Sequence, residues 1–135
     1  MRSKEVFRYL LIVSWCMVAI AGSAMSTSFA DAVKNTSAAL KEGSAKKLSA
    51  LFNNTVSLSI KREEGTFTKF QAELLLQEFF RSNKVNELKV VQQANNSTTS
   101  FIVFTLTSNA KNYRVFVKFI QANNKEFKID EVRIE

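Results

Sequence analysis

The sequence predicts an α+β fold, in which helices from the first half of the chain cover one face of an antiparallel sheet. Three observations predict it. A capped helix with an apolar stripe is indicated over residues 68–82, a strand of period two precedes it at residues 56–60, and four β segments follow between residues 85 and 134. Strands joined by short turns pair antiparallel, and the apolar face of such a sheet needs helices to bury it. The expected order is ααβ(β)αββββ, with three helices on one side of one sheet.

The best-marked helix follows the turn at Gly65. Thr68 and Gln71 have the spacing of a capping box, in which each side chain bonds a free backbone N–H of the first turn. The apolar positions then follow the spacing of one buried stripe: Ala72, Leu75, Leu76, Phe79 and Phe80. Phe70 and Leu74 are expected to widen this stripe. We therefore expect a core helix that ends near Ser82.

Two shorter helices are expected before the first strand. Asp31 is placed to cap the first of them, which runs to about Glu42 and stops at Gly43, a residue suited to a left-handed C-cap. Ser44 is placed to cap the second, which ends at Asn53. Both helices are amphipathic, so we expect them to pack on the same sheet face as the central helix.

The last four strands are separated by turns rich in asparagine, and they are expected at residues 85–94, 100–107, 112–120 and 127–134. The second of them has an apolar run on both faces, as a central strand does. In the fourth strand the alternation slips near Asp130 and Glu131. Either a bulge lies there, or Glu131 and Arg133 point to the same side as the apolar residues before them.

The N-terminus has the pattern of a secretory signal. Basic residues in positions 1–8 precede an apolar run at 9–21, which is too short to span a bilayer comfortably. Small residues allow cleavage after Ala24 or after Ala30. A cut after Ala30 would set the new α-amine against the helix dipole, which favours Ala24 without deciding between the two sites.

We therefore expect residues 1–30 to be a signal peptide and residues 31–135 to be a single domain that is exported to the periplasm or the extracellular space, with no membrane span in the mature chain. The only cysteine, Cys16, lies in the signal, so the mature chain would have no disulfide. The formal charge is +7, of which the first thirty residues hold +2. The remaining basic residues are scattered, so nucleic-acid binding is not expected.

The composition also restricts the chemistry. The chain contains no histidine, which excludes Ser-His-Asp and Cys-His catalysis and removes the usual proton shuttle at neutral pH. A zinc site would lack its histidine and cysteine ligands. No metal and no cofactor are expected.

Five segments carry a resemblance to known proteins: Ala38–Gly43, Leu51–Val56, the junction Gly65–Phe80, Asn112–Val115 and Val132–Glu135. The junction, with the order of elements, resembles the NTF2-like cone fold, which is also similar to the cystatin fold. More closely, the chain resembles a family of small secreted proteins of Bacteroidota known as domain of unknown function 4783. The resemblance implies a curved sheet that encloses a pocket with the helices, and an open sheet face that often forms a dimer. It implies no activity. The segment at 92–96 lacks the Gln-x-Val-x-Gly hairpin of a cystatin inhibitor.

Two classes of function stay open. The first is an exported, non-enzymatic binding or interaction module. The alternative is an NTF2-like pocket enzyme of the isomerase or dehydratase type with Glu131 as the base. A structural ion pair of Glu131 with Arg133 or Lys118 is the favoured interpretation of that carboxylate.

The candidate ligand-binding residues, in the pocket or at its rim, are Tyr113, Arg114, Glu131 and Arg133. Arginine presents a fork that suits a carboxylate or phosphate. Phe104 or Phe116, on the face without helices, are the candidates for a homodimer interface, because exposed aromatic patches mark association. A small ligand of unknown identity is the other candidate partner.

Overall fold

The structure is a computed structural model, and it describes residues 28–96 and 98–135. Its helices are α2 (Phe29–Glu42), α3 (Ala45–Ser49) and α4 (Lys69–Ser82). Its strands are β1 (Phe52–Ile60), β2 (Glu63–Thr68), β3 (Glu87–Asn95), β4 (Ser100–Ser108), β5 (Lys111–Gln121) and β6 (Phe127–Ile134). The predicted α+β class and order of elements are confirmed. Residues 1–27 of the expected signal sequence, with Cys16 and the cleavage site at Ala24, lie outside the described residues, whereas the alternative cleavage site at Ala30 lies in the first turn of α2.

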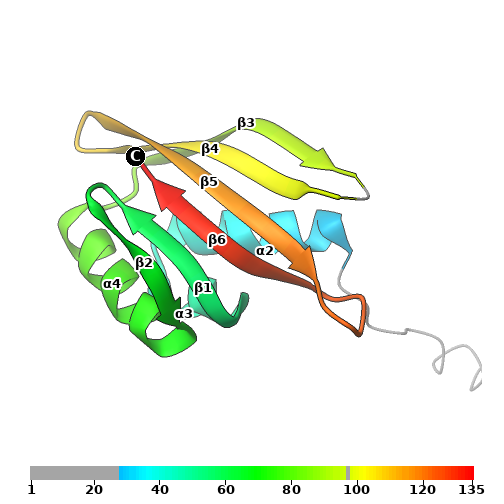
Figure 1. Cartoon of the computed structure of the whole chain (residues 1–135). Helices are drawn as coiled ribbons and strands as arrows, with labels where there is room; N and C mark the ends of the chain where they lie inside the picture. Colours follow the sequence, from blue (N-terminus) through cyan, green and yellow to red (C-terminus); the bar gives the residue numbers. More distant parts are fainter. Residues whose placement is uncertain (1–27, 97) are drawn as a thin grey trace, which may run out of the picture.

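The six strands form one curved sheet in the order β2-β1-β6-β5-β4-β3 (Figure 1). The predicted meander from β3 to β6 is antiparallel throughout, as is the β1–β2 hairpin. The first strand, however, pairs parallel with the last. No hairpin turn joins these two strands, so their relative direction is set by the path of the chain through α4. The predicted cone is therefore confirmed, with one parallel pair in a sheet that is otherwise antiparallel.

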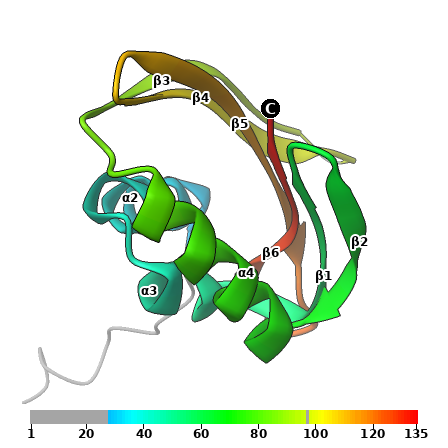
Figure 2. The same ribbon diagram turned by 90° about the vertical axis from the view of Figure 1, so that its left-hand side faces the viewer.

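All three helices lie on the concave face of the sheet (Figure 2). The core between them is apolar, and its largest fully buried side chains include Phe52, Phe104, Leu40, Leu48, Leu76 and Leu106. This layered arrangement buries one stripe of each helix and one face of the sheet, as an α+β domain requires. In the described part of the chain, no helix has both the length and the apolar character needed to cross a membrane.

Helix α2 begins earlier than the sequence predicted. Ser28 is its N-cap, and the Ser28 hydroxyl accepts a hydrogen bond from the backbone N–H of Asp31 at 3.2 Å. The expected cap at Asp31 is wrong because a serine three residues earlier satisfies that N–H. Asp31 instead lies in the first turn, where a carboxylate suits the helix dipole. The extra turn contains Phe29, whose ring meets those of Phe119 and Phe127 edge-on, each at 5.8 Å.

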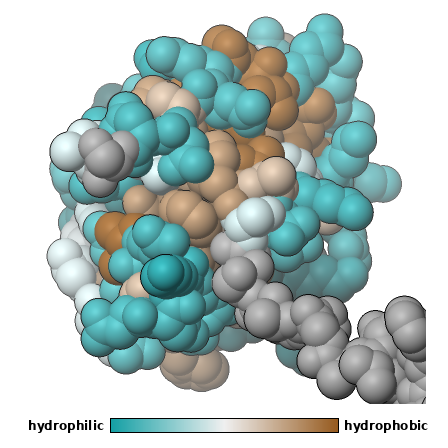
Figure 3. Space-filling view, turned by 90° about the vertical axis from the view of Figure 1, so that its right-hand side faces the viewer, coloured by the Kyte–Doolittle hydropathy of each residue, from teal (hydrophilic) through white to brown (hydrophobic). Residues whose placement is uncertain are grey.

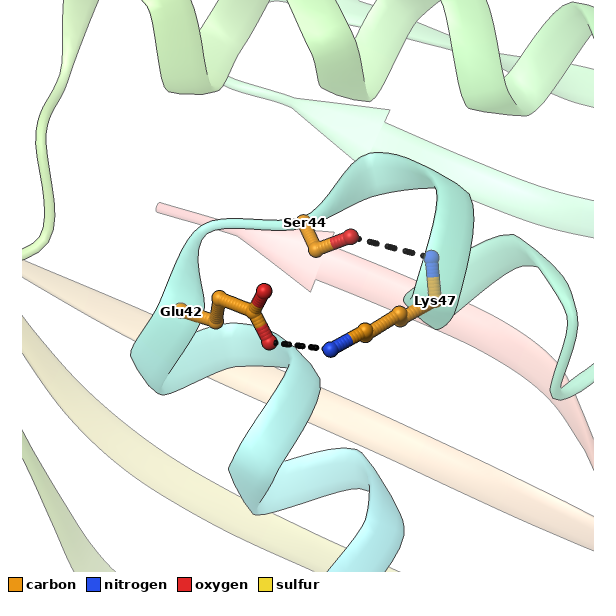
Figure 4. Close-up of polar contacts among 3 residues, drawn as sticks. All are labelled: Glu42, Ser44 and Lys47. Carbon is orange, nitrogen blue, oxygen red and sulfur yellow. Dashed lines mark hydrogen bonds and ion pairs between the residues drawn. The ribbon is translucent and has the colours of Figure 1, made fainter.

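The corner between α2 and α3 follows the predicted pattern (Figure 4). Gly43 has a left-handed backbone with φ of 68°, and the Ser44 hydroxyl accepts from the N–H of Lys47 at 3.1 Å. The ammonium of Lys47 also bonds the carboxylate of Glu42 at 2.7 Å. Both side chains are more than half exposed, so this pair contributes at most about 1 kcal/mol. Gly43 and the Ser44 cap therefore determine where α2 ends and α3 begins.

Helix α4 has the predicted capping box, in which Thr68 and Gln71 bond each other's backbone N–H groups at 3.3 and 3.1 Å. Its stripe is narrower than expected. Phe70 and Leu74 are 67% and 50% exposed, so the prediction that they widen the buried stripe is wrong. Two residues along a helix turn the side chain by about 200°, which places Phe70 on the face opposite Ala72.

A β-bulge resolves the slipped alternation in β6. Lys118 pairs with Glu131 and Phe119 pairs with Ile129, so Asp130 is the extra residue. The bulge is the first of the two alternatives that the sequence left open. It lets Ile129 and Val132 both face the core, where each is fully buried.

Candidate functional site

The four predicted site residues lie on opposite faces of the sheet. Residues paired directly across antiparallel strands share a face. Tyr113 pairs with Leu106, which is fully buried under the helices. Glu131 and Arg133 instead pair with Lys118 and Phe116 of β5, and Arg114 alternates with Tyr113. The structure therefore brings Arg114, Glu131 and Arg133 to the convex face and separates Tyr113 from them.

Tyr113 is part of the core. Its hydroxyl donates to Oδ1 of Asn83 at 2.9 Å, and Nδ2 of Asn83 donates to the carbonyl of Phe79 at 3.0 Å. The Tyr113 ring also meets the Phe79 ring edge-on at 5.4 Å. These contacts satisfy the buried polar atoms and tie the C-terminal end of α4 to β5. A ligand that reached the Tyr113 hydroxyl would have to replace this hydrogen bond.

The convex face carries an outer aromatic patch, which we define as Phe101, Phe116, Arg114, Glu131 and Arg133. The rings of Phe101 and Phe116 stack with centroids 5.6 Å apart. The guanidinium carbon of Arg133 lies 5.8 Å from the Phe116 centroid, and its Nε donates to Glu131 at 2.8 Å. The ion pair that the sequence favoured for Glu131 is thus present.

A buried valine and a hollow lie next to the outer aromatic patch. Val103 pairs with Phe116 and is only 2% exposed, although no helix covers this face (Figure 2). A hollow of about 230 Å³ lies beside the Phe116 ring and is lined by Arg114, Phe116, Arg133 and Glu135. Of the two predicted dimer residues, Phe116 lies on this face. Phe104 does not, because it is fully buried on the inner face opposite Val115.

The interior holds few polar groups. Among the described residues, the buried polar side chains are Thr36, Ser49, Asn83, Ser100 and Ser108, and none of them is charged. Glu131, the proposed base of the enzyme alternative, is directed away from this interior by the bulge at Asp130. No group of three or more histidine, cysteine or acidic residues comes together in the described part of the chain.

The sequence did not reveal a second concave feature, which we call the α4–hairpin cleft. It is an open cleft of about 430 Å³ between the C-terminal half of α4 and the β1–β2 turn. Ile60, Leu75 and Phe79 supply apolar lining, and Lys61, Arg62, Glu63 and Glu78 supply charges. The charge cluster at the turn was visible in the sequence, but its position beside α4 depends on the path of the chain between them.

Apolar side chains also reach the surface at the end of the molecule where α2 begins and the β5–β6 turn lies (Figure 3). The aromatic residues that meet there are Phe29, Phe119 and Phe127. Phe119 is buried, whereas Phe29 and Phe127 are half-buried. These rings close the end of the core.

The arrangement of elements is that of the NTF2-like proteins. An NTF2-like protein of unknown function from Cytophaga hutchinsonii is similar in structure, with a TM-score of 0.60 at 9% identity over 84% of this chain and 93% of that one. At that identity the likeness shows the fold alone.

The chain belongs to the family described as domain of unknown function (DUF4783), which matches residues 33–135. Family proteins of known structure are similar. One from Bacteroides fragilis is 31% identical with a TM-score of 0.68, over 74% of this chain and 93% of that one. Another, from Bacteroides uniformis, is 26% identical with a TM-score of 0.71, over 76% and 94% of the two chains. A comparison with functionally curated proteins gives no match.

Proposed function

We propose that this protein is an exported, non-enzymatic interaction module that associates through the outer aromatic patch, with a second copy of itself as the partner. The observation that carries the proposal is the stacked pair of Phe101 and Phe116 on a sheet face that no helix covers. Half-buried aromatic residues on an open face are typical of association surfaces.

The charges around the rings favour a second copy as the occupant. Arg114 and Arg133 lie beside Glu135 in the same hollow, and Glu131 forms an ion pair with Arg133. A two-fold interface brings each residue of a patch against the same patch on the other copy. A patch that carries both signs can therefore pair its arginines with the partner copy's carboxylates.

The interior supports a non-enzymatic role. The buried described residues supply no carboxylate or ammonium group, and the chain has no histidine. General acid–base catalysis needs such a group within reach of the substrate. Tyr113, the one buried phenol among the described residues, already donates a hydrogen bond to Oδ1 of Asn83.

Sedimentation equilibrium tests association through the patch. Phe116→Glu places a charge at the centre of the patch, and Thr66→Glu is the matched control, because Thr66 is an exposed residue of β2 outside the patch. We expect the wild type and Thr66→Glu to form dimers at micromolar concentrations and Phe116→Glu to stay monomeric. A monomeric wild type at millimolar concentration, or a dimeric Phe116→Glu, would contradict the proposal.

Export is the second part of the proposal, with residues 1–24 as the cleaved signal. Cleavage after Ala30 would remove the Ser28 cap and the Phe29 ring, which contacts Phe119 and Phe127. Cleavage after Ala24 keeps both. The intact mass of the protein secreted by a bacterial host should therefore correspond to a chain that begins at Met25. A chain that begins at Asp31, or one that keeps Met1, would overturn this part.

A further inference from the structure

We propose that the α4–hairpin cleft binds a short apolar peptide with free termini, a zwitterion whose side chains rest on the apolar lining. This site is separate from the outer aromatic patch. Its volume of about 430 Å³ lies within the range of roughly 300–1,000 Å³ that is typical of small-molecule sites.

The two walls of the cleft carry complementary charges. The hairpin wall presents Lys61 and Arg62, and the α4 wall presents Glu78. None of these three groups forms an ion pair with another described residue, although four such pairs exist elsewhere in the described chain. Both signs are thus available to a ligand. A peptide can set its carboxylate on the hairpin wall and its ammonium group on the α4 wall.

Glu63 adds a further carboxylate to the hairpin side. The net charge of the lining is therefore balanced, which disfavours a simple anion such as phosphate. The apolar lining of Ile60, Leu75 and Phe79 disfavours a purely polar zwitterion. Together these features select a ligand with two opposite charges and an apolar body.

The backbone at Lys61 has a fixed conformation at the edge of the cleft. Its φ is 56°, in the left-handed region where residues other than glycine, asparagine and aspartate are uncommon. Its N–H donates to the carbonyl of Ile134 at 2.9 Å, and its ammonium lies 5.6 Å from the Tyr113 ring centroid. Lys61 is the first residue of the two-residue β1–β2 turn, and such hairpin turns need a positive φ. The turn and the bond to Ile134 hold the Lys61 backbone in place in the lining of the cleft.

The end of α4 supplies neutral polar groups to the same site. Ser82 and Asn83 line the cleft, and Asn83 is fixed by its bonds to Tyr113 and Phe79. Both amide atoms of Asn83 are thus already bonded within the protein, and the Ser82 hydroxyl is the group offered to a peptide amide between the two charged termini. The cleft therefore offers a dipeptide two opposite charges, a hydroxyl and an apolar lining.

Isothermal titration with leucyl-leucine tests the proposal, with N-acetyl-leucyl-leucine and leucyl-leucinamide as blocked probes. We expect saturable binding of the free dipeptide and at least about tenfold weaker binding of each blocked form, because a charge-assisted contact is lost. Absence of saturable binding, or equal binding of the blocked peptides, would overturn the proposal.

Three variants locate the site. Lys61→Gly removes the ammonium and suits the left-handed backbone, Glu78→Gln removes the opposing charge, and Glu64→Gln is the control, since Glu64 lies outside the lining. Each of the first two should weaken leucyl-leucine about tenfold. The Lys61→Gly effect should vanish with leucyl-leucinamide and the Glu78→Gln effect with the acetylated peptide. An effect of Glu64→Gln equal to that of Glu78→Gln would contradict the assignment.

Discussion

Replacing Tyr113 with phenylalanine separates a structural role from a ligand-binding one. The substitution deletes the hydroxyl that donates to Asn83 at 2.9 Å and keeps the ring that packs on Phe79. Tyr113 is 7% and Asn83 9% exposed, so water replaces the lost donor poorly. A buried acceptor left without its partner costs about 1–3 kcal/mol. Because Asn83 retains its bond to Phe79, we expect a loss of about 1–2 kcal/mol in the free energy of unfolding.

Urea denaturation of the chain from Met25 onward measures this loss, and thermal unfolding should show a drop of about 4 °C for each kcal/mol in a domain of this size. A double-mutant cycle with Asn83→Ala should give a coupling of about 0.5–1.5 kcal/mol. A Tyr113→Phe protein as stable as the wild type, or an additive cycle, would refute the structural role.

Three further substitutions have defined outcomes in the same unfolding assay. Ala110→Gly should stabilise the protein by about 1 kcal/mol. Ala110 has a φ of 65° in the two-residue β4–β5 turn, and a left-handed backbone strains a residue with a Cβ. An unchanged stability would count against that strain. Gly43→Ala should destabilise it by about 1 kcal/mol, since a Cβ there meets no atom closer than 3.7 Å and only the φ of 68° opposes it. A loss above about 3 kcal/mol would instead indicate a clash. Phe29→Ala should lower the free energy of unfolding by about 2 kcal/mol, near half the loss for a fully buried ring, because it removes two edge-on aromatic contacts. An unchanged free energy of unfolding would show that the first turn of α2 does not contribute to stability.

The fold was largely predictable because local signals agreed with it. Three of these signals depend only on residues within one or two turns of a helix. They are the capping box at Thr68, the apolar stripe of α4 that ends at Phe80, and the glycine C-cap at Gly43. The parallel pairing of β1 with β6 was not predictable in this way, since it joins Leu58 to Val132 across most of the domain.

The candidate site was less predictable because it depends on side-chain direction. The bulge at Asp130 decides which face Glu131 occupies, and the alternation pattern alone allowed both. Tyr113 and Arg114 are adjacent in a strand and so point to opposite faces, yet both carry groups suited to a ligand. The α4–hairpin cleft combines Lys61 with Glu78, and their proximity follows from the way α4 packs against the hairpin.

We propose that copies of this protein associate through the outer aromatic patch. Backbone NMR spectra recorded over a dilution series test it most directly, because only residues at the interface shift as the oligomer dissociates. We expect the largest shifts at Phe101, Phe116 and Arg133. Shifts confined to the β3 edge or to the exposed Phe70 and Leu74 of α4 would contradict association through this patch, as would spectra that do not change with concentration.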